Sequence, residues 1–327
     1  MNLHTPFDNF NFGNKTCYLS GETLDSTEQK TEVFPLWLQN RFDLNDKPFR
    51  HLNEKYATYG KLKVPVSNAL LNNVLNPFEA KIEHAFTSGY DVVKDLSEQE
   101  IFLWFGKIMY GIIFNEIQIA LLEKPAGEPL SFSATLINKF SNHLRFLQTL
   151  FIPTEYEDFK PWSVSVFKVK QSEDRFDYRN EMNTLVASLQ MNGFGIVVCM
   201  QDNGENKRLH RPALELINGK ELHPIQFQEM NARFYYSAYL FNRIPQYVSL
   251  PPSEKMNKYT ISAMPLHGGE GKALFDSWNN KTYCQVLEAF WKPWGIVLFE
   301  IYKNPDNPMT FLVNEQGGFN EKVDLPY

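Results

Sequence analysis

An α+β fold is predicted by the order in which helical and strand patterns follow one another. Residues 97–150 carry two helical patterns, whereas the runs typical of strands gather mostly after residue 160. Helices and strands that are segregated in this way are typical of an α+β fold rather than of a regular βαβ alternation. A hydrophobic content of 43% and a charged content of 21% over 327 residues are those of an ordinary globular chain.

Residues 1–90 are expected to form a small N-terminal module, because they are polar and hold only short apolar runs. Residues 17–21 predict a tight turn between short strands. Residues 34–42 predict a short helix that Pro35 opens, since a first helical turn tolerates the missing N–H of proline. A second helical stretch covers residues 70–86, and we expect Pro77 to interrupt it.

Residues 97–150 are expected to form a long helical hairpin. The sequence S-E-Q-E at 97–100 fits a capping box, which starts a helix by satisfying its first N–H groups. Prolines and a glycine at 125–129 end this helix, and a second helix is predicted for residues 131–150.

The apolar stretch at 101–122 has the length of a membrane span. Lys107 and Glu116 interrupt it, and a charge near the bilayer centre costs about 3 kcal/mol on insertion scales. A helix that is apolar nearly all round is more simply the buried central helix of a large domain. We therefore expect no membrane partner.

Residues 160–327 are expected to form a mixed or antiparallel sheet with helices, and they complete an α+β domain at 91–327. Residues 163–169 alternate as a half-buried strand does, and residues 184–191 do so loosely. Asn192-Gly193 predicts a two-residue hairpin, because its turn needs positive φ angles. The remaining expected elements are strands at 194–200, 259–264, 296–302 and 310–313 and helices at 224–242 and 272–290.

Charge and cysteine content limit the possible functions. A net charge of −6 gives no general attraction to phosphate, so any contact with nucleic acid requires a local basic surface. Three widely spaced cysteines cannot build a disulfide framework or a four-thiolate zinc site. The first residues lack the basic and apolar regions of a secretory signal, and we therefore expect a cytoplasmic protein.

Four short blocks in the N-terminal module occur in a characteristic order. They read C-Y-L-S-G at 17–21, T-E-V-F-P at 31–35, V-P-V-S-N-A-L-L-N at 64–72 and L-N-P-F-E at 75–79. This order and spacing resembles the HNH (ββα-metal) endonucleases of the zinc-knuckle kind. The resemblance implies a strand pair followed by a helix, and it implies descent from a metal-dependent nuclease.

The catalytic positions of that family have changed in this chain. The family's base His falls at Glu32 and the preceding acidic residue at Thr31, while the paired asparagines fall at Leu71 and Asn72. Glu32 is the candidate catalytic residue, because a carboxylate can bind Mg²⁺ or act as a base, and Asn72 is a candidate oxygen ligand. The alternative is that Glu32 only stabilises the start of the helix at Pro35.

The zinc-binding positions have changed as well. Of the family's four thiolates only Cys17 remains, and the others fall at Ser20, Ser67 and Leu70. One thiolate, two hydroxyl groups and a leucine do not form a structural zinc site, so we expect no structural zinc.

Lys207, Arg208 and Arg211 form the densest basic cluster, and they are candidate contacts for nucleic acid. The alternative is a solvated loop whose charges have no partner outside the protein.

These observations give two hypotheses of function. The first is an HNH-nuclease-related protein that associates with DNA or RNA, has lost or altered its catalysis, and serves in bacterial defence. If such a protein is active, it is a divalent-metal-dependent endonuclease that uses Glu32. The second is a non-enzymatic module that binds another protein through its aromatic-rich α+β domain.

Overall fold

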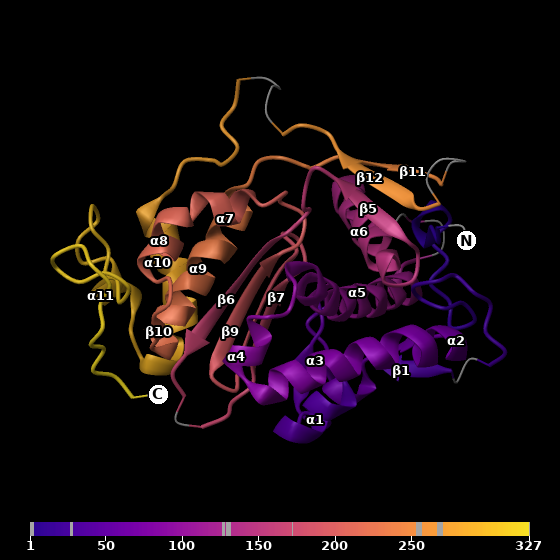
Figure 1. Ribbon diagram of the computed structural model, residues 1–327, viewed down its shortest axis with the longest axis horizontal. Helices are drawn as coiled ribbons and strands as arrows, with labels where there is room; N and C mark the ends of the chain where they lie inside the picture. The colour runs from indigo at the N-terminus through magenta and orange to yellow at the C-terminus, as the bar shows by residue number, and fades with distance from the viewer. Residues whose placement is uncertain are drawn as a thin grey trace. The chain divides into compact units, whose positions relative to one another are not determined.

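The chain has an α+β fold that divides into two compact units (Figure 1). The computed structural model describes residues 3–26, 29–125, 128, 132–171, 173–252, 257–266 and 271–326. Unit 1 comprises Met1–Ala85, Glu98–Phe159 and Gln246–Ala263, and unit 2 comprises Phe86–Ser97, Lys160–Pro245 and Met264–Tyr327. Each unit is thus assembled from separated stretches. The division differs from the predicted one at residue 90, because the helical hairpin belongs to the same unit as the N-terminal module.

Unit 1 combines short strands with two long helices. Its helices are α1 (Leu36–Phe42), α2 (Asn68–Leu70), α3 (Asn76–Ser88, which ends in unit 2), α5 (Glu98–Glu123) and α6 (Ala134–Leu147), with 3-10 turns at Pro6–Asp8, Tyr59–Lys61 and Gln148–Leu150. Its strands are β1 (Lys30–Glu32), β2 (Pro48–Arg50), β3 (Tyr56–Thr58), β4 (Lys63–Pro65), β5 (Thr154–Glu157), β11 (Tyr247–Leu250) and β12 (Tyr259–Ala263). Strand β1 pairs antiparallel with β4, β2 pairs with β3, and β12 lies between β11 and β5.

The predicted helical hairpin is confirmed, and α5 is the central helix of unit 1. His143 of α6 bonds through Nε2 to the carbonyl oxygen of Gly106 at 2.9 Å, so the end of α6 lies beside the early turns of α5. The two helices are therefore antiparallel. Of the described helices, α5 alone is long and apolar enough for a membrane span, but most of it is buried within the unit. This burial is that of a core helix, and a soluble protein is plausible. The expected break at 125–129 lies partly outside the described residues.

The chain after β4 forms one continuous helical stretch. Helix α2 leads into a π-helical turn, η3 (Leu71–Leu75), and α3 follows without a gap. The backbone N–H of Asn76 bonds to the carbonyl of Leu71, five residues earlier. Pro77 was expected to interrupt the helix, and this expectation is wrong. The wider π turn directly before it relieves the clash that a proline ring makes with the preceding turn.

Unit 2 is built on a five-stranded sheet in the order β10-β6-β9-β8-β7. Its strands are β6 (Ser163–Val169), β7 (Asp177–Glu181), β8 (Val186–Met191), β9 (Phe194–Cys199) and β10 (Glu221–Leu222), and its helices are α4 (Tyr90–Val93), α7 (Glu205–Leu209), α8 (Arg211–Leu216), α9 (Pro224–Leu240), α10 (Asn280–Trp291) and α11 (Leu298–Ile301), with a 3-10 turn at Lys292–Trp294. Strand β10 is parallel to β6, and the other pairs are antiparallel. The mixed sheet is therefore as predicted.

Helix α9 packs against this sheet and against α10 (Figure 1). Gly195 of β9 lies under the ring of Phe227, where a Cβ atom would overlap the ring. The absent side chain thus lets the helix approach the sheet closely. Between β8 and β9, Asn192 and Gly193 have φ angles of 44° and 77°, which are those of the predicted hairpin turn.

Two predicted strands in the last quarter of the chain are wrong. Residues 296–302 contain the short helix α11, and residues 310–313 form no strand of the sheet. Glu229 of α9 explains the second difference. Its buried carboxylate accepts the backbone N–H groups of Phe311 and Leu312 at 2.8 and 3.2 Å. A side chain thus takes the hydrogen bonds that a neighbouring strand would otherwise provide.

Candidate functional site

A pocket of about 310 Å³ lies in unit 1 where the HNH resemblance predicts a catalytic site. The end of β1 and the start of α1 form one side of it, and η3 and α3 form the other. Its charged or aromatic lining residues are Tyr18, Glu32, Trp37, Glu79, Glu83 and Lys107.

Glu79 is the most strongly held side chain of this pocket. One carboxylate oxygen accepts the indole N–H groups of Trp37 and Trp104, each at 2.9 Å. The other oxygen lies 2.5 Å from the ammonium nitrogen of Lys107. The side chains of Lys107 and Glu79 are only 10% and 16% exposed. This is an ion pair that the protein shields from water and that additional donors orient.

The two predicted catalytic residues have separate environments. Glu32 lines the pocket, but its carboxylate pairs with Lys63, which lies directly opposite on β4, at 3.0 Å. Asn72 is exposed in the π turn and is not a lining residue, and its side-chain oxygen accepts a hydrogen bond from Asn76 at 3.3 Å. The pocket therefore contains Glu32 without the predicted ligand Asn72.

Tyr18 forms part of the pocket lining next to Glu79. Its side chain is 2% exposed and stacks on Tyr110, with 6.1 Å between ring centres. Burial raises the pKa of the Tyr18 phenol well above its ordinary value, and the charges of Cys17 and Glu79 raise this pKa further. The phenol is therefore neutral at physiological pH and offers a hydrogen bond donor.

The positions that bind zinc in the resembled family do not form a thiolate site. Cys17 is fully buried, the Ser67 hydroxyl accepts the backbone N–H of Leu70 at 3.3 Å, and the Leu70 side chain is itself buried. Within the part of the chain that the structure describes, no group of three or more His, Cys, Asp or Glu is placed to hold a metal ion. These donors do not fit a structural zinc.

Two of the pocket's three carboxylates, those of Glu79 and Glu32, already have an ammonium partner. Lys107 and two indoles hold the carboxylate of Glu79, and Lys63 holds that of Glu32. A metal ion would have to displace an ammonium group from each of these carboxylates. The pocket thus contains a cation of its own, the Lys107 ammonium.

The predicted basic cluster lies in unit 2, on α7 and α8. Arg208 pairs with Glu205, and Arg211 pairs with Glu215 at 3.7 Å, while both guanidinium groups remain largely exposed. Lys207 is half-buried, and its backbone N–H donates to the hydroxyl of Ser163 at 3.0 Å. The three residues thus lie on two consecutive helices, and neighbouring carboxylates offset part of the charge of Arg208 and Arg211.

A buried carboxylate anchors the start of α7. Asp202 accepts the Ser163 hydroxyl at 2.6 Å and the backbone N–H of Asn206 at 2.9 Å. Burial raises the pKa of Asp202, whereas its hydrogen bonds lower it. These contacts fix the helix that carries Lys207 and Arg208, and they are structural.

The ion pair between Glu79 and Lys107 is not predicted from the sequence. Glu79 belongs to the block at 75–79 without an assigned role, and Lys107 is predicted only to interrupt an apolar helix. A lysine within a stretch that is otherwise buried is itself a signal, because such a charge requires a partner.

Comparisons with protein-family models, curated proteins and solved structures find no match to this chain.

Proposed function

We propose that this chain is an HNH-nuclease-related cytoplasmic protein that associates with nucleic acid and has lost metal-dependent cleavage. The observation that carries the proposal is the Glu79–Lys107 ion pair inside the unit 1 pocket. An ammonium group occupies the place beside the pocket's carboxylates where a nuclease needs a divalent ion.

The arrangement of unit 1 supports the relationship to that family. The antiparallel pair β1–β4 is followed by the helical stretch of α2, η3 and α3, which is the order of a ββα module with α1 and the β2–β3 pair inserted between its strands. The backbone N–H of Tyr18 donates to the carbonyl of Pro65 at 2.9 Å, so the turn at 17–21 lies against the end of β4. In the resembled family, the turn at 17–21 and the segment after β4 would face each other across a zinc ion, and here they are neighbours.

The surface around Lys207, Arg208 and Arg211 supports contact with phosphate groups. Arg211 can exchange its carboxylate partner Glu215 for phosphate, because this exposed ion pair contributes only about 0–1 kcal/mol. Arg208 keeps its pair with the buried Glu205, but its guanidinium group is largely exposed and can also contact phosphate. The unit 1 pocket, with Glu32, Glu79 and Glu83 against Lys107, repels phosphate in the absence of a metal ion. Nucleic acid is therefore expected at unit 2 and not at the ancestral pocket.

The test combines a cleavage assay with a binding assay. The purified chain should leave plasmid DNA intact in Mg²⁺ or Mn²⁺ and should bind DNA or RNA with an affinity that falls as salt rises. Replacing Lys207, Arg208 and Arg211 by alanine should reduce the salt slope by as much as about 0.9 for each lost phosphate contact. A matched control replaces the exposed Lys281, Lys303 and Lys322 and should keep the slope.

Two results would contradict the proposal. Metal-dependent nicking that Glu32→Gln abolishes would show that the pocket is still a nuclease site. Absence of any nucleic-acid binding at low salt would instead favour the protein-binding alternative. That alternative has support in unit 2, where Phe299 of α11 is 81% exposed and the adjoining Val297 is 49% exposed.

A further inference from the structure

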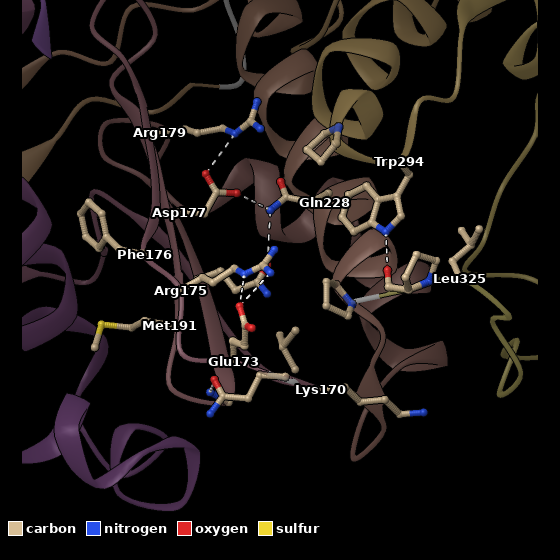
Figure 2. A pocket seen from close by; sticks show the side chains of 17 residues that line it. Lys170, Glu173, Arg175, Phe176, Asp177, Arg179, Met191, Gln228, Trp294 and Leu325 are labelled. Atoms are coloured by element: carbon tan, nitrogen blue, oxygen red, sulfur yellow. Dashed lines mark hydrogen bonds and ion pairs between the residues drawn. The ribbon is translucent and has the colours of Figure 1, made fainter. Parts of the chain in front are cut away.

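Unit 2 contains a second and larger pocket, of about 580 Å³ (Figure 2). The segment before β7, the strands β7 and β8, the start of α9 and the C-terminal segment around Leu325 line it. Its volume is within the range of about 300–1,000 Å³ that is typical of small-molecule sites. All of its lining residues belong to unit 2.

One wall of this pocket is polar and internally ordered. Gln228 of α9 is 3% exposed, and its side-chain nitrogen donates to Asp177 at 2.8 Å and to Gln190 at 3.4 Å. Asp177 also pairs with Arg179 at 3.5 Å. Among the described residues, the side-chain nitrogen of Gln190 has no hydrogen-bond partner. This wall thus holds a fixed carboxylate and offers a donor that a ligand can use.

The opposite wall is apolar and rigid. Trp294 donates its indole N–H to the carbonyl of Pro326 at 2.9 Å, and His223 donates to the carbonyl of Leu325 at 3.0 Å. His223 can donate through Nε2 because its Nδ1 accepts the backbone N–H of Ile225. Figure 2 shows Trp294 across the pocket from Arg175 and Asp177. The indole therefore presents a flat surface in a fixed orientation.

Two cations of the lining remain available to a ligand. Lys170 is half-buried, and its ammonium group has no ion-pair partner within the described part of the chain. Arg175 pairs with Glu173 at 2.8 Å, but both side chains are about 70% exposed, at 73% and 69%. An anion can replace a carboxylate in such an exposed pair at little cost, since the pair contributes about 0–1 kcal/mol.

We propose that this pocket binds a small organic anion that carries a flat ring. The ring lies against Trp294, and the anionic group is bound by one of the two cations, Arg175 or Lys170, which Figure 2 shows at separate edges of the pocket. Gln190 and Asp177 offer a donor and an acceptor to the polar edge of the ring. The shared chemistry, a ring joined to a phosphate or a carboxylate, belongs to nucleotides and to aromatic carboxylic acids.

Isothermal titration calorimetry with the full chain tests this proposal. The probes are 5′-AMP as a ring phosphate, indole-3-acetate as a ring carboxylate, adenosine as a neutral ring and inorganic phosphate as an anion without a ring. At least one of the first two should bind at least about tenfold more tightly than both adenosine and phosphate. Whichever of the two binds identifies the source of the anion.

Charge variants assign the binding to this pocket. The double variant Lys170→Met and Arg175→Ala should weaken binding of the anionic ligand by at least about tenfold, because it removes the charge-assisted contact at either edge of the pocket. Lys168→Met is the matched control, since Lys168 lies two residues earlier and pairs with Glu221. Binding that the double variant leaves unchanged, or no binding of any ring-bearing anion, overturns the proposal. Neither result depends on whether the chain binds nucleic acid.

Discussion

The pockets of the two units differ in how they use their charged side chains. In the unit 1 pocket, of about 310 Å³, Lys107 and Glu79 form a shielded ion pair that two indoles complete. In the unit 2 pocket, of about 580 Å³, Lys170 has no ion-pair partner among the described residues, and Arg175 has an exposed one. The first pocket lies where the sequence resemblance predicts a catalytic site, and the second lies outside the segments that carry that resemblance.

The difference shows that a charged pocket is not by itself a binding site. A shielded ammonium group that already has a carboxylate partner has little attraction left for a ligand, and breaking the pair leaves a buried charge. A cation without a partner can still gain energy from an anion that enters. We therefore assign ligand binding to the unit 2 pocket, and we assign a structural role to the pair in the unit 1 pocket.

The largest effect is expected on breaking the shielded pair. Lys107→Met removes the ammonium and leaves the Glu79 carboxylate without its charge partner, which should lower the free energy of unfolding by about 3–5 kcal/mol. Urea denaturation measures this change. Lys63→Ala is the matched control, because its pair with Glu32 is more exposed and should contribute no more than about 1 kcal/mol. Equal losses of unfolding free energy in the two variants would show that the shielded pair contributes no more to stability than the exposed one.

The second effect concerns pH and should be similar in the two units. Burial lowers the pKa of His143 in unit 1 and of His210 in unit 2 to about 4, from 6.5. In the unfolded chain the two imidazoles therefore become protonated below pH 6.5, whereas in the folded chain they stay neutral until about pH 4. The free energy of unfolding is therefore highest above pH 6.5, where each imidazole is neutral in both the folded and the unfolded chain. For each histidine it decreases by as much as about 3 kcal/mol as pH falls to 4.

Urea denaturation at several pH values between 4 and 7 isolates this contribution. His143→Gln should make the unfolding free energy less dependent on pH than in the unsubstituted chain, because glutamine does not titrate. An unchanged pH dependence in this variant would show that His143 takes up its proton in the folded chain as readily as in the unfolded one.

The smallest effect is expected from packing in unit 2. Gly195→Ala places a methyl group against the ring of Phe227, and α9 must shift to accommodate it, which should cost about 1–3 kcal/mol. Gly13→Ala is the control, because a Cβ atom there meets only Asn11 at an ordinary 3.7 Å. Thermal denaturation compares the two variants. A neutral Gly195→Ala would mean that the contact between α9 and the sheet tolerates an added methyl group.

The parts of the fold that local chemistry determines could be predicted. The alternation at 163–169 and the Asn192-Gly193 turn act through neighbouring residues, and the structure confirms both. Residues 310–313 have strand propensity, but Glu229, about 80 residues away in sequence, holds their backbone instead. Such a contact leaves no local pattern. The discontinuous units escape prediction for the same reason.

The candidate site shows the same limit. The order of short blocks predicts a site in this part of unit 1, and Glu32 does line a pocket there. The pairing of Glu79 with Lys107 joins residues 28 positions apart on two helices, so it becomes visible only once α3 packs on α5. The sequence therefore predicts a position at which a pocket lies, but it does not predict the ion pair inside that pocket.

The π turn at Leu71–Leu75 determines the direction in which each later side chain of α3 points around the helix axis. A π turn holds one more residue than an α turn, and each residue of a helix rotates the next by about 100°. Loss of a single residue from this turn would swing Glu79 away from both indoles. A single-residue insertion or deletion at residues 72–74 would thus change the arrangement around Glu79 without replacing any residue that lines the pocket.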